Sequence, residues 1–246
     1  MSDQLSPPSS KKYPGICLLP NLFTIASMFA GFYAIIAGLQ GRFELAVIAI
    51  FIALLCDGLD GRVARWTGSE SELGAQLDSL ADMVSFGVAP AILAYSWSLS
   101  VLGKPGWLTA FIYMVCTSLR LARFNSQDQS EEKHFFCGLN TPSAAAFIAA
   151  TLWLCITYEI DGMTMAVPMV ILLFTLALLK VSRIPYRSFK DFDLRRHVPI
   201  TTILIAIFLL VLITLAPPQT LFIFILAYVL SGPFGFLYKK CRRQHS

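Results

Sequence analysis

The chain has 246 residues, of which 56% are hydrophobic and only 14% are charged. This composition is more apolar than that of ordinary soluble domains, so it excludes a typical soluble globular protein and indicates a polytopic membrane protein. The formal net charge is +4, and we expect no nucleic-acid partner.

We expect an all-α fold with one membrane domain. Residues 1–16 are predicted to form a flexible arm, residues 17–238 a single transmembrane domain, and residues 239–246 a basic tail. Most of the apolar runs are close to the 20 or so residues that a spanning helix needs, so we predict about eight transmembrane helices, with six as the alternative. The runs lie at about 17–38, 43–60, 75–99, 106–122, 142–158, 164–180, 199–216 and 219–238.

The basic residues predict the orientation of these helices. If the N-terminus is cytoplasmic, only Arg42 and Lys104 of the 19 lysines and arginines fall in outward-facing loops. Basic residues concentrate on the cytoplasmic side of membrane proteins. We therefore expect both termini to be cytoplasmic.

The first predicted helix begins with two polar residues close to a proline. Pro20 is favourable at the start of a helix, and Asn21 and Thr24 follow it at the cytoplasmic end. These two side chains fit either of two roles, as polar residues at a helix end or as contacts for a ligand.

Four carboxylates stand close together in the stretch 57–82. Asp57 and Asp60 are three residues apart, and Asp78 and Asp82 are four apart, so each pair projects from one face of a helix. The short polar segment between the pairs can turn the chain and set two helices antiparallel, which would gather all four acids. An all-oxygen site of this kind suits Mg²⁺ or Mn²⁺.

Three glycines lie in the same stretch. Gly58, Gly61 and Gly74 each cost about 1 kcal/mol relative to alanine in a helix interior, so something needs close access to the backbone. A phosphate or nucleotide could approach there. Arg65 lies one helical turn beyond Gly61, where its guanidinium could hold a phosphate beside the metals.

The spacing of these residues resembles a family signature. The chain matches D-x2-D-G-x2-A-R-x8-G-x3-D-x3-D at every fixed position, namely Asp57, Asp60, Gly61, Ala64, Arg65, Gly74, Asp78 and Asp82. This pattern resembles the CDP-alcohol phosphotransferase family, membrane enzymes that join a CDP-activated group to an alcohol and release CMP. A simple solvated helix hairpin is the alternative, but acids within membrane helices are usually functional.

The resemblance implies roles for particular residues. Asp57, Asp60, Asp78 and Asp82 would hold two Mg²⁺ or Mn²⁺ ions, and Asp82 would also be the catalytic base. The P-N-x-x-T-x(6)-G pattern that ends at Gly31 is similar to the family's first helix, although close relatives often carry Asn where this chain has Ser27. The residues expected to contact CDP-diacylglycerol are Asn21, Thr24, Gly61, Ala64, Arg65, Ser71 and Gly74.

Two further stretches resemble the phosphatidylserine synthase branch of the family. R-L-A-R-F-N runs from Arg120 to Asn125, and F-C-G-L-N-T-P-S-A-A-A begins at Phe136, with Asn140 where the branch has Pro. Arginine is a natural partner for an amino-acid carboxylate, so Arg120 and Arg123 are the expected serine-binding residues. The alternative is that both arginines only anchor a helix end at the membrane surface.

The densest basic segment runs from Lys180 to His197. Part of it, from Ile184 to Lys190, is again similar to the synthase branch. A basic cluster beside a membrane attracts anionic lipid by roughly 1 kcal/mol per cation, and membrane topology explains most of this segment.

The resemblance therefore implies transfer of a phosphatidyl group from CDP-diacylglycerol to L-serine, giving phosphatidylserine and CMP. It also implies a homodimer in the bacterial inner membrane, surrounded by membrane lipids, with the active site facing the cytoplasm. The same chemistry with glycerol 3-phosphate or inositol phosphate is an alternative. A transporter or a cation-binding scaffold is a more distant one.

Overall fold

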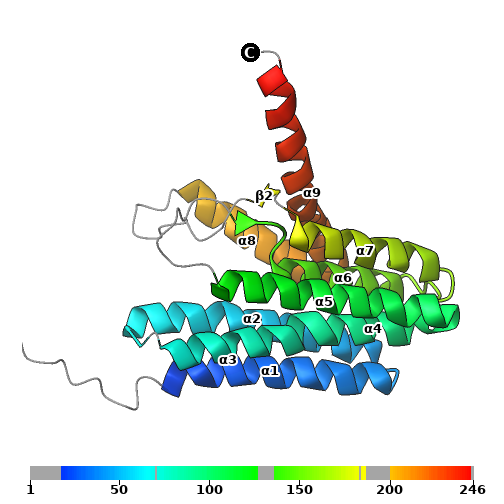
Figure 1. The fold of residues 1–246 in the computed structure, drawn as a ribbon, viewed down its shortest axis with the longest axis horizontal. Coiled ribbons are helices and arrows are strands. Elements are labelled where there is room, and N and C mark those ends of the chain that lie inside the picture. Colours follow the sequence, from blue (N-terminus) through cyan, green and yellow to red (C-terminus); the bar gives the residue numbers. More distant parts are fainter. Residues whose placement is uncertain (1–17, 70, 127–135, 183, 187–199, 245–246) are drawn as a thin grey trace, which may run out of the picture.

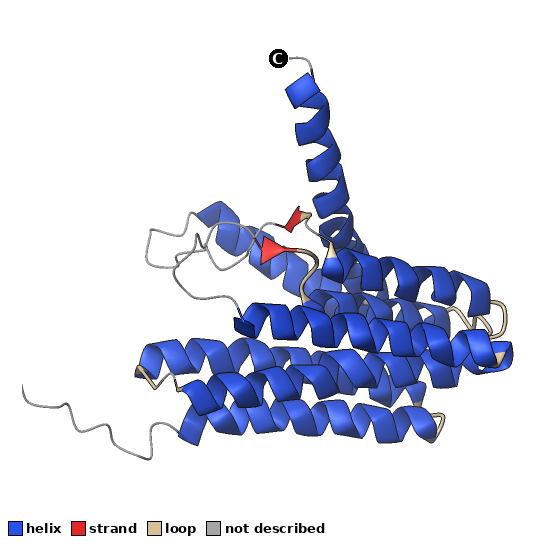
Figure 2. Cartoon of the chain, viewed as in Figure 1, coloured by secondary structure: helices blue, strands red, loops and turns tan. Residues whose placement is uncertain are grey.

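The protein is almost entirely helical (Figure 1, Figure 2). The structure is a computed structural model that describes residues 18–69, 71–126, 136–182, 184–186 and 200–244. Its helices are α1 (Leu18–Leu39), α2 (Phe43–Thr67), α3 (Glu72–Asp82), α4 (Ala89–Trp97), α5 (Lys104–Ser126), α6 (Thr141–Thr157), α7 (Ala166–Val181), α8 (Ile200–Leu215) and α9 (Pro217–Gln244).

Shorter elements connect some of these helices. A π-helical segment, η1 (Met83–Val88), joins α3 to α4 without a break, and a 3₁₀ turn, η2 (Leu99–Leu102), precedes α5. The two-residue strands β1 (Phe136–Cys137) and β2 (Pro185–Tyr186) pair antiparallel, with Phe136 opposite Tyr186. The predicted all-α fold is confirmed apart from this short ladder.

The helices fall on the predicted apolar runs. By length and hydropathy, three stretches of the described chain can cross a membrane: Pro20–Leu39, Glu72–Trp97 and Pro217–Gly235. Large apolar side chains such as Phe29, Leu55 and Phe208 are more than 60% exposed on the outside of the bundle, which is typical of a surface that faces lipid. The number of helices that cross the membrane stays a prediction. Residues 1–16 and most of the basic segment lie outside the described residues.

The polypeptide turns place the four acids at one end of the bundle. The start of α1, the α2–α3 turn and the end of α5 lie together there, whereas the α1–α2 turn and the start of α5 lie at the opposite end (Figure 1). Gly68 ends α2 in the left-handed conformation at φ 60°, and Ser71 caps α3 by accepting a hydrogen bond from the Gly74 N–H at 3.1 Å. Because both caps are local, the hairpin that carries the acids is determined by neighbouring residues.

Helix α1 packs closely against α2 and against the continuous α3–η1–α4 helix. The Ser27 hydroxyl donates to the Ala53 carbonyl at 3.0 Å, and the Ser85 hydroxyl donates to the Ser27 carbonyl at 2.9 Å. Ser27 is therefore a buried link between α1 and α2. A Cβ added to Gly31 would lie 2.5 Å from Ser85 Cα, so only glycine allows this approach.

We expect Gly31→Ala to destabilise the protein by about 1–3 kcal/mol, because the added methyl group forces α1 away from η1. For a chain of this size, that corresponds to a fall of roughly 2–12 °C in Tm, measured by thermal unfolding in detergent. Gly235→Ala is the matched control, since a Cβ at Gly235 would meet nothing within 4 Å. An equal Tm for wild type and Gly31→Ala would show that the α1–η1 approach has no such constraint.

Candidate metal centre

Three carboxylates from two helices, α2 and α3, lie close together in the α2–α3 hairpin. One oxygen from each of Asp57, Asp60 and Asp78 lies within 4.8 Å of the other two. Two ligands on opposite sides of one Mg²⁺ would be about 4.2 Å apart, so small side-chain shifts would let one ion contact all three. The predicted gathering of these acids is thus present in the structure.

Asp60 is held in place by α1. It is 6% exposed, and its Oδ2 accepts a hydrogen bond from the Thr24 hydroxyl at 2.8 Å. Thr24 is itself only 4% exposed. Thr24 is therefore not simply a polar residue at an exposed helix end, because its side chain is buried and positions the Asp60 carboxylate.

Asp82 completes the group of four acids. Its carboxyl lies within electrostatic range of Asp57, Asp78 and Arg120, and its Oδ1 is buried without a hydrogen-bond partner. Leaving a buried carboxylate oxygen unpaired costs free energy, so such an atom indicates a missing ligand. The all-oxygen donor set and this unpaired atom both fit a hard divalent cation.

A π-helical segment begins directly after Asp82. The Tyr113 hydroxyl, fully buried in α5, donates to the Phe86 carbonyl of this segment at 3.2 Å. Single π-helical turns are rare and are often found at functional sites. Here the segment changes the helical phase between the acids on α3 and the buried face of α4.

The residues predicted to bind the nucleotide surround the acids in two groups. Asn21 Oδ1 and Ser71 Oγ both lie close to Gly74, at 3.3 and 3.1 Å from the position that a Cβ on that glycine would occupy. On α2, Arg65 folds back so that its Nε donates to the Gly61 carbonyl at 2.9 Å. Ala64 lies half-buried beside Arg65.

The structure separates the two arginines predicted to bind serine. Arg120 is partly buried, and its terminal nitrogen donates to Thr141 Oγ1 at 3.0 Å, while its Nε is buried without a partner. Arg123 is exposed and donates to the Val181 carbonyl at 3.3 Å. Arg120 lies within electrostatic range of Asp82, and serine binding by either arginine stays a prediction.

Sequence reasoning missed a buried cation, Lys180. The Lys180 side chain is 0% exposed, although in the sequence it begins the basic segment that runs to His197. A signal was present in its spacing, because Lys180 continues the face that Leu173, Leu176 and Ala177 bury.

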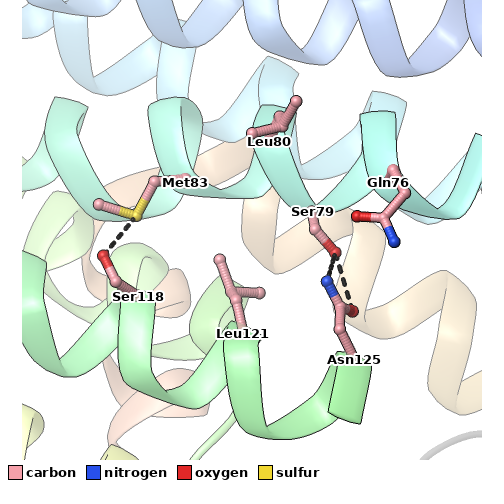
Figure 3. Close-up of a pocket in the computed structure, with 7 residues that line it drawn as sticks. All are labelled: Gln76, Ser79, Leu80, Met83, Ser118, Leu121 and Asn125. Carbon is pink, nitrogen blue, oxygen red and sulfur yellow. Dashed lines mark hydrogen bonds between the residues drawn. The ribbon is translucent and has the colours of Figure 1, made fainter.

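Figure 3 shows a shallow cavity of about 210 Å³ between α3, η1 and α5. Ser79 and Asn125 hydrogen bond across it at 3.0–3.1 Å, and the Ser118 hydroxyl lies 3.3 Å from the Met83 sulfur. None of the four carboxylates lines this cavity, so it is separate from the metal centre.

Comparisons with known proteins agree with the sequence motif. The sequence profile of the CDP-alcohol phosphatidyltransferase family matches residues 17–181. A CDP-diacylglycerol–serine O-phosphatidyltransferase of Mycobacterium leprae is 33% identical over 94% of this chain and 78% of its own length. The enzymes of the same name from Helicobacter pylori and Bacillus subtilis are 33% and 35% identical, over 90% and 70% of this chain and 92% and 91% of their own lengths.

We expect Mn²⁺ to raise the Tm of the purified protein, since a ligand that binds only the folded state stabilises it by about 2.7 kcal/mol at a hundredfold excess over Kd. Asp57→Asn, Asp60→Asn and Asp78→Asn should each diminish this rise, because each removes an anionic ligand. Asp161→Asn, at an exposed position between α6 and α7, is the control and should keep it. A rise of equal size in all four variants would place Mn²⁺ binding elsewhere.

Proposed function

The chain belongs to the CDP-alcohol phosphatidyltransferase family, and we propose that it transfers the phosphatidyl group of CDP-diacylglycerol to the hydroxyl of L-serine, giving phosphatidylserine and CMP. The observation that carries the choice of serine is the similarity, over most of the chain, to enzymes named for this reaction. Arg120, which is partly buried and within electrostatic range of Asp82, supports it, because an amino acid brings a carboxylate that a guanidinium can bind.

Asp82 is the proposed catalytic base. The serine oxygen attacks the phosphorus that bears the diacylglycerol, and the bond from that phosphorus to the CMP oxygen breaks. The serine proton passes to the Asp82 carboxylate, whose Oδ1 has no hydrogen-bond partner among the described residues. This direct displacement needs no covalent intermediate on the enzyme.

Asp57, Asp60, Asp78 and Asp82 are the proposed ligands of two Mg²⁺ or Mn²⁺ ions. When bound, these ions would neutralise the charge of the pyrophosphate and of the departing CMP. Thr24 keeps the Asp60 carboxylate oriented by donating a hydrogen bond to its Oδ2.

Gly61 is the strongest candidate for contact with the cytidine diphosphate. A Cβ at this position would meet nothing within 4 Å, so packing of the protein does not require glycine there. Helix propensity disfavours glycine by about 1 kcal/mol. The remaining reason for glycine is a ligand that approaches the backbone, with Arg65 folded over the same carbonyl and able to meet a phosphate. Asn21, Thr24, Ala64, Ser71 and Gly74 are the other proposed contacts.

The lipid substrate also requires apolar surface next to the acids. Beyond Asn21 and Thr24, α1 exposes Ile25, Phe29 and Phe32, which together with Met28 and Val84 line a shallow apolar cavity of about 350 Å³. We propose that the diacylglycerol tails lie along this face, within the bilayer, while the head group reaches the acids.

The chain is an integral membrane protein, since it combines long apolar helices with a membrane-enzyme family. We place it in the bacterial inner membrane, with the acids on the cytoplasmic side. Among the described lysines and arginines, only Arg42 and Lys104 lie at the end of the bundle opposite the acids, which supports this orientation (Figure 1). A homodimer is proposed from the family resemblance.

The experiment is CMP release from CDP-diacylglycerol by the purified protein, measured with L-serine, glycerol 3-phosphate, inositol phosphate or no acceptor. We expect serine to exceed the other acceptors at least about tenfold, and Asp82→Asn to lower the serine rate by roughly 10²–10⁴ because the base is lost. Asp161→Asn is the control. CMP release with glycerol 3-phosphate but not with serine would identify glycerol 3-phosphate as the acceptor. An absence of CMP release with every alcohol would favour a transporter or a scaffold instead.

A further inference from the structure

Lys180 is a fully buried basic residue that has no role in the reaction proposed above. It lies in the last turn of α7, is 0% exposed, and its Nζ donates to Thr117 Oγ1 at 2.6 Å. The Thr117 hydroxyl hydrogen is engaged with the Tyr113 carbonyl at 2.9 Å, so only a lone pair of that oxygen meets the ammonium. Nζ also lies 3.4 Å from the centre of the Tyr113 ring.

These contacts do not neutralise the charge. Burying an ammonium group costs several kcal/mol unless an anion compensates for it. Within the described residues, Lys180 forms no ion pair, and the titratable groups that act on it are Arg120, Cys116 and Asp82. Arg120 is a second cation, so the two basic groups repel each other until an anion lies between them.

The groups around Arg120 have unused hydrogen-bonding capacity of both kinds. On the donor side, Arg120 Nε is buried without a partner, and the Lys180 ammonium has one oxygen partner for its three hydrogens. On the acceptor side, Asp82 Oδ1 and Asn140 Oδ1 are buried without partners. Asn140 adjoins Thr141, which accepts a hydrogen bond from Arg120.

This set of unused groups matches a small zwitterion that carries a hydroxyl. The carboxylate of this molecule would accept hydrogen bonds from Arg120 and Lys180 and lie between them. Its ammonium would donate to a buried acceptor, and its hydroxyl would reach Asp82. We propose that Lys180 and Arg120 together form the subsite for the carboxylate of the acceptor, and that Lys180 is the residue that selects for that carboxylate. This inference rests on the proposed function, since it identifies what makes serine the preferred alcohol.

The test compares L-serine with L-serinamide, in which a neutral amide replaces the carboxylate. Lys180→Met and Lys180→Gln remove the charge but keep an unbranched side chain of similar length. We expect each to raise the KM for serine about ten- to a hundredfold, and to lower by the same factor the ratio of kcat/KM for serine to that for serinamide. The KM for CDP-diacylglycerol should stay within about twofold. Serine should also raise the Tm of wild type, and not that of the variants.

Two further variants separate the charge from its surroundings. Lys104→Met, at an exposed position at the other end of the bundle, should behave as wild type. Thr117→Val keeps the ammonium and removes its oxygen partner, so it should retain the preference for serine within about threefold. An equal loss of preference in Thr117→Val and Lys180→Met would assign the effect to packing and overturn the proposal.

The outcomes also distinguish this inference from the proposed function. If wild type uses serine and the Lys180 variants still discriminate serine from serinamide as wild type does, the carboxylate subsite is refuted while the reaction stands. Equal weakening of both substrates in these variants refutes it as well. If wild type releases no CMP with serine, the proposed function fails, and the subsite fails with it.

Discussion

Four carboxylates lie within an apolar helix bundle, and the rest of the structure depends on how their negative charge is balanced. Carboxylates cannot stay charged in such surroundings without nearby cations or hydrogen-bond donors. The bundle supplies a hydrogen-bond donor from Thr24 on α1 and basic groups from Arg120 on α5 and Lys180 on α7. Oxygen ligands from Asp57, Asp60 and Asp78 converge as they would around divalent ions. Helices far apart in the sequence thus meet at the acids.

Much of this arrangement could be predicted because it is local in the sequence. The apolar runs predicted where the helices lie, since length and hydropathy determine a membrane helix. Asp57 and Asp60 share a face of α2 because they are three residues apart, and a turn capped by Gly68 and Ser71 brings α3 alongside. The acid cluster therefore followed from spacing alone, and the motif added its chemistry. Eight crossings of the membrane stay a prediction, because composition alone identifies three.

What the sequence left open depends on contacts between distant residues. Lys180 and Thr117 are 63 positions apart, so the spacing of Lys180 on α7 could indicate that it is buried but not which partner it meets. Arg120 and Arg123 look equivalent in the sequence, yet Arg120 lies within electrostatic range of Asp82 and Arg123 donates to the Val181 carbonyl. The Ser27 hydroxyl likewise donates to the backbone of α2, at a partner 26 positions away in the sequence. Charge and hydropathy report how polar a residue is, whereas the partner that it meets is decided by how helices pack.

The central claim is that the acid cluster holds the divalent ions on which transfer to serine depends. The most direct measurement is serine-dependent CMP release by chelator-treated protein, followed as Mn²⁺ is titrated back. We expect no CMP release in chelator and full recovery with Mn²⁺ in wild type, whereas in Asp78→Asn the recovered rate should be lower by several orders of magnitude. Undiminished release in the presence of chelator, or equal recovery in Asp78→Asn, would contradict it.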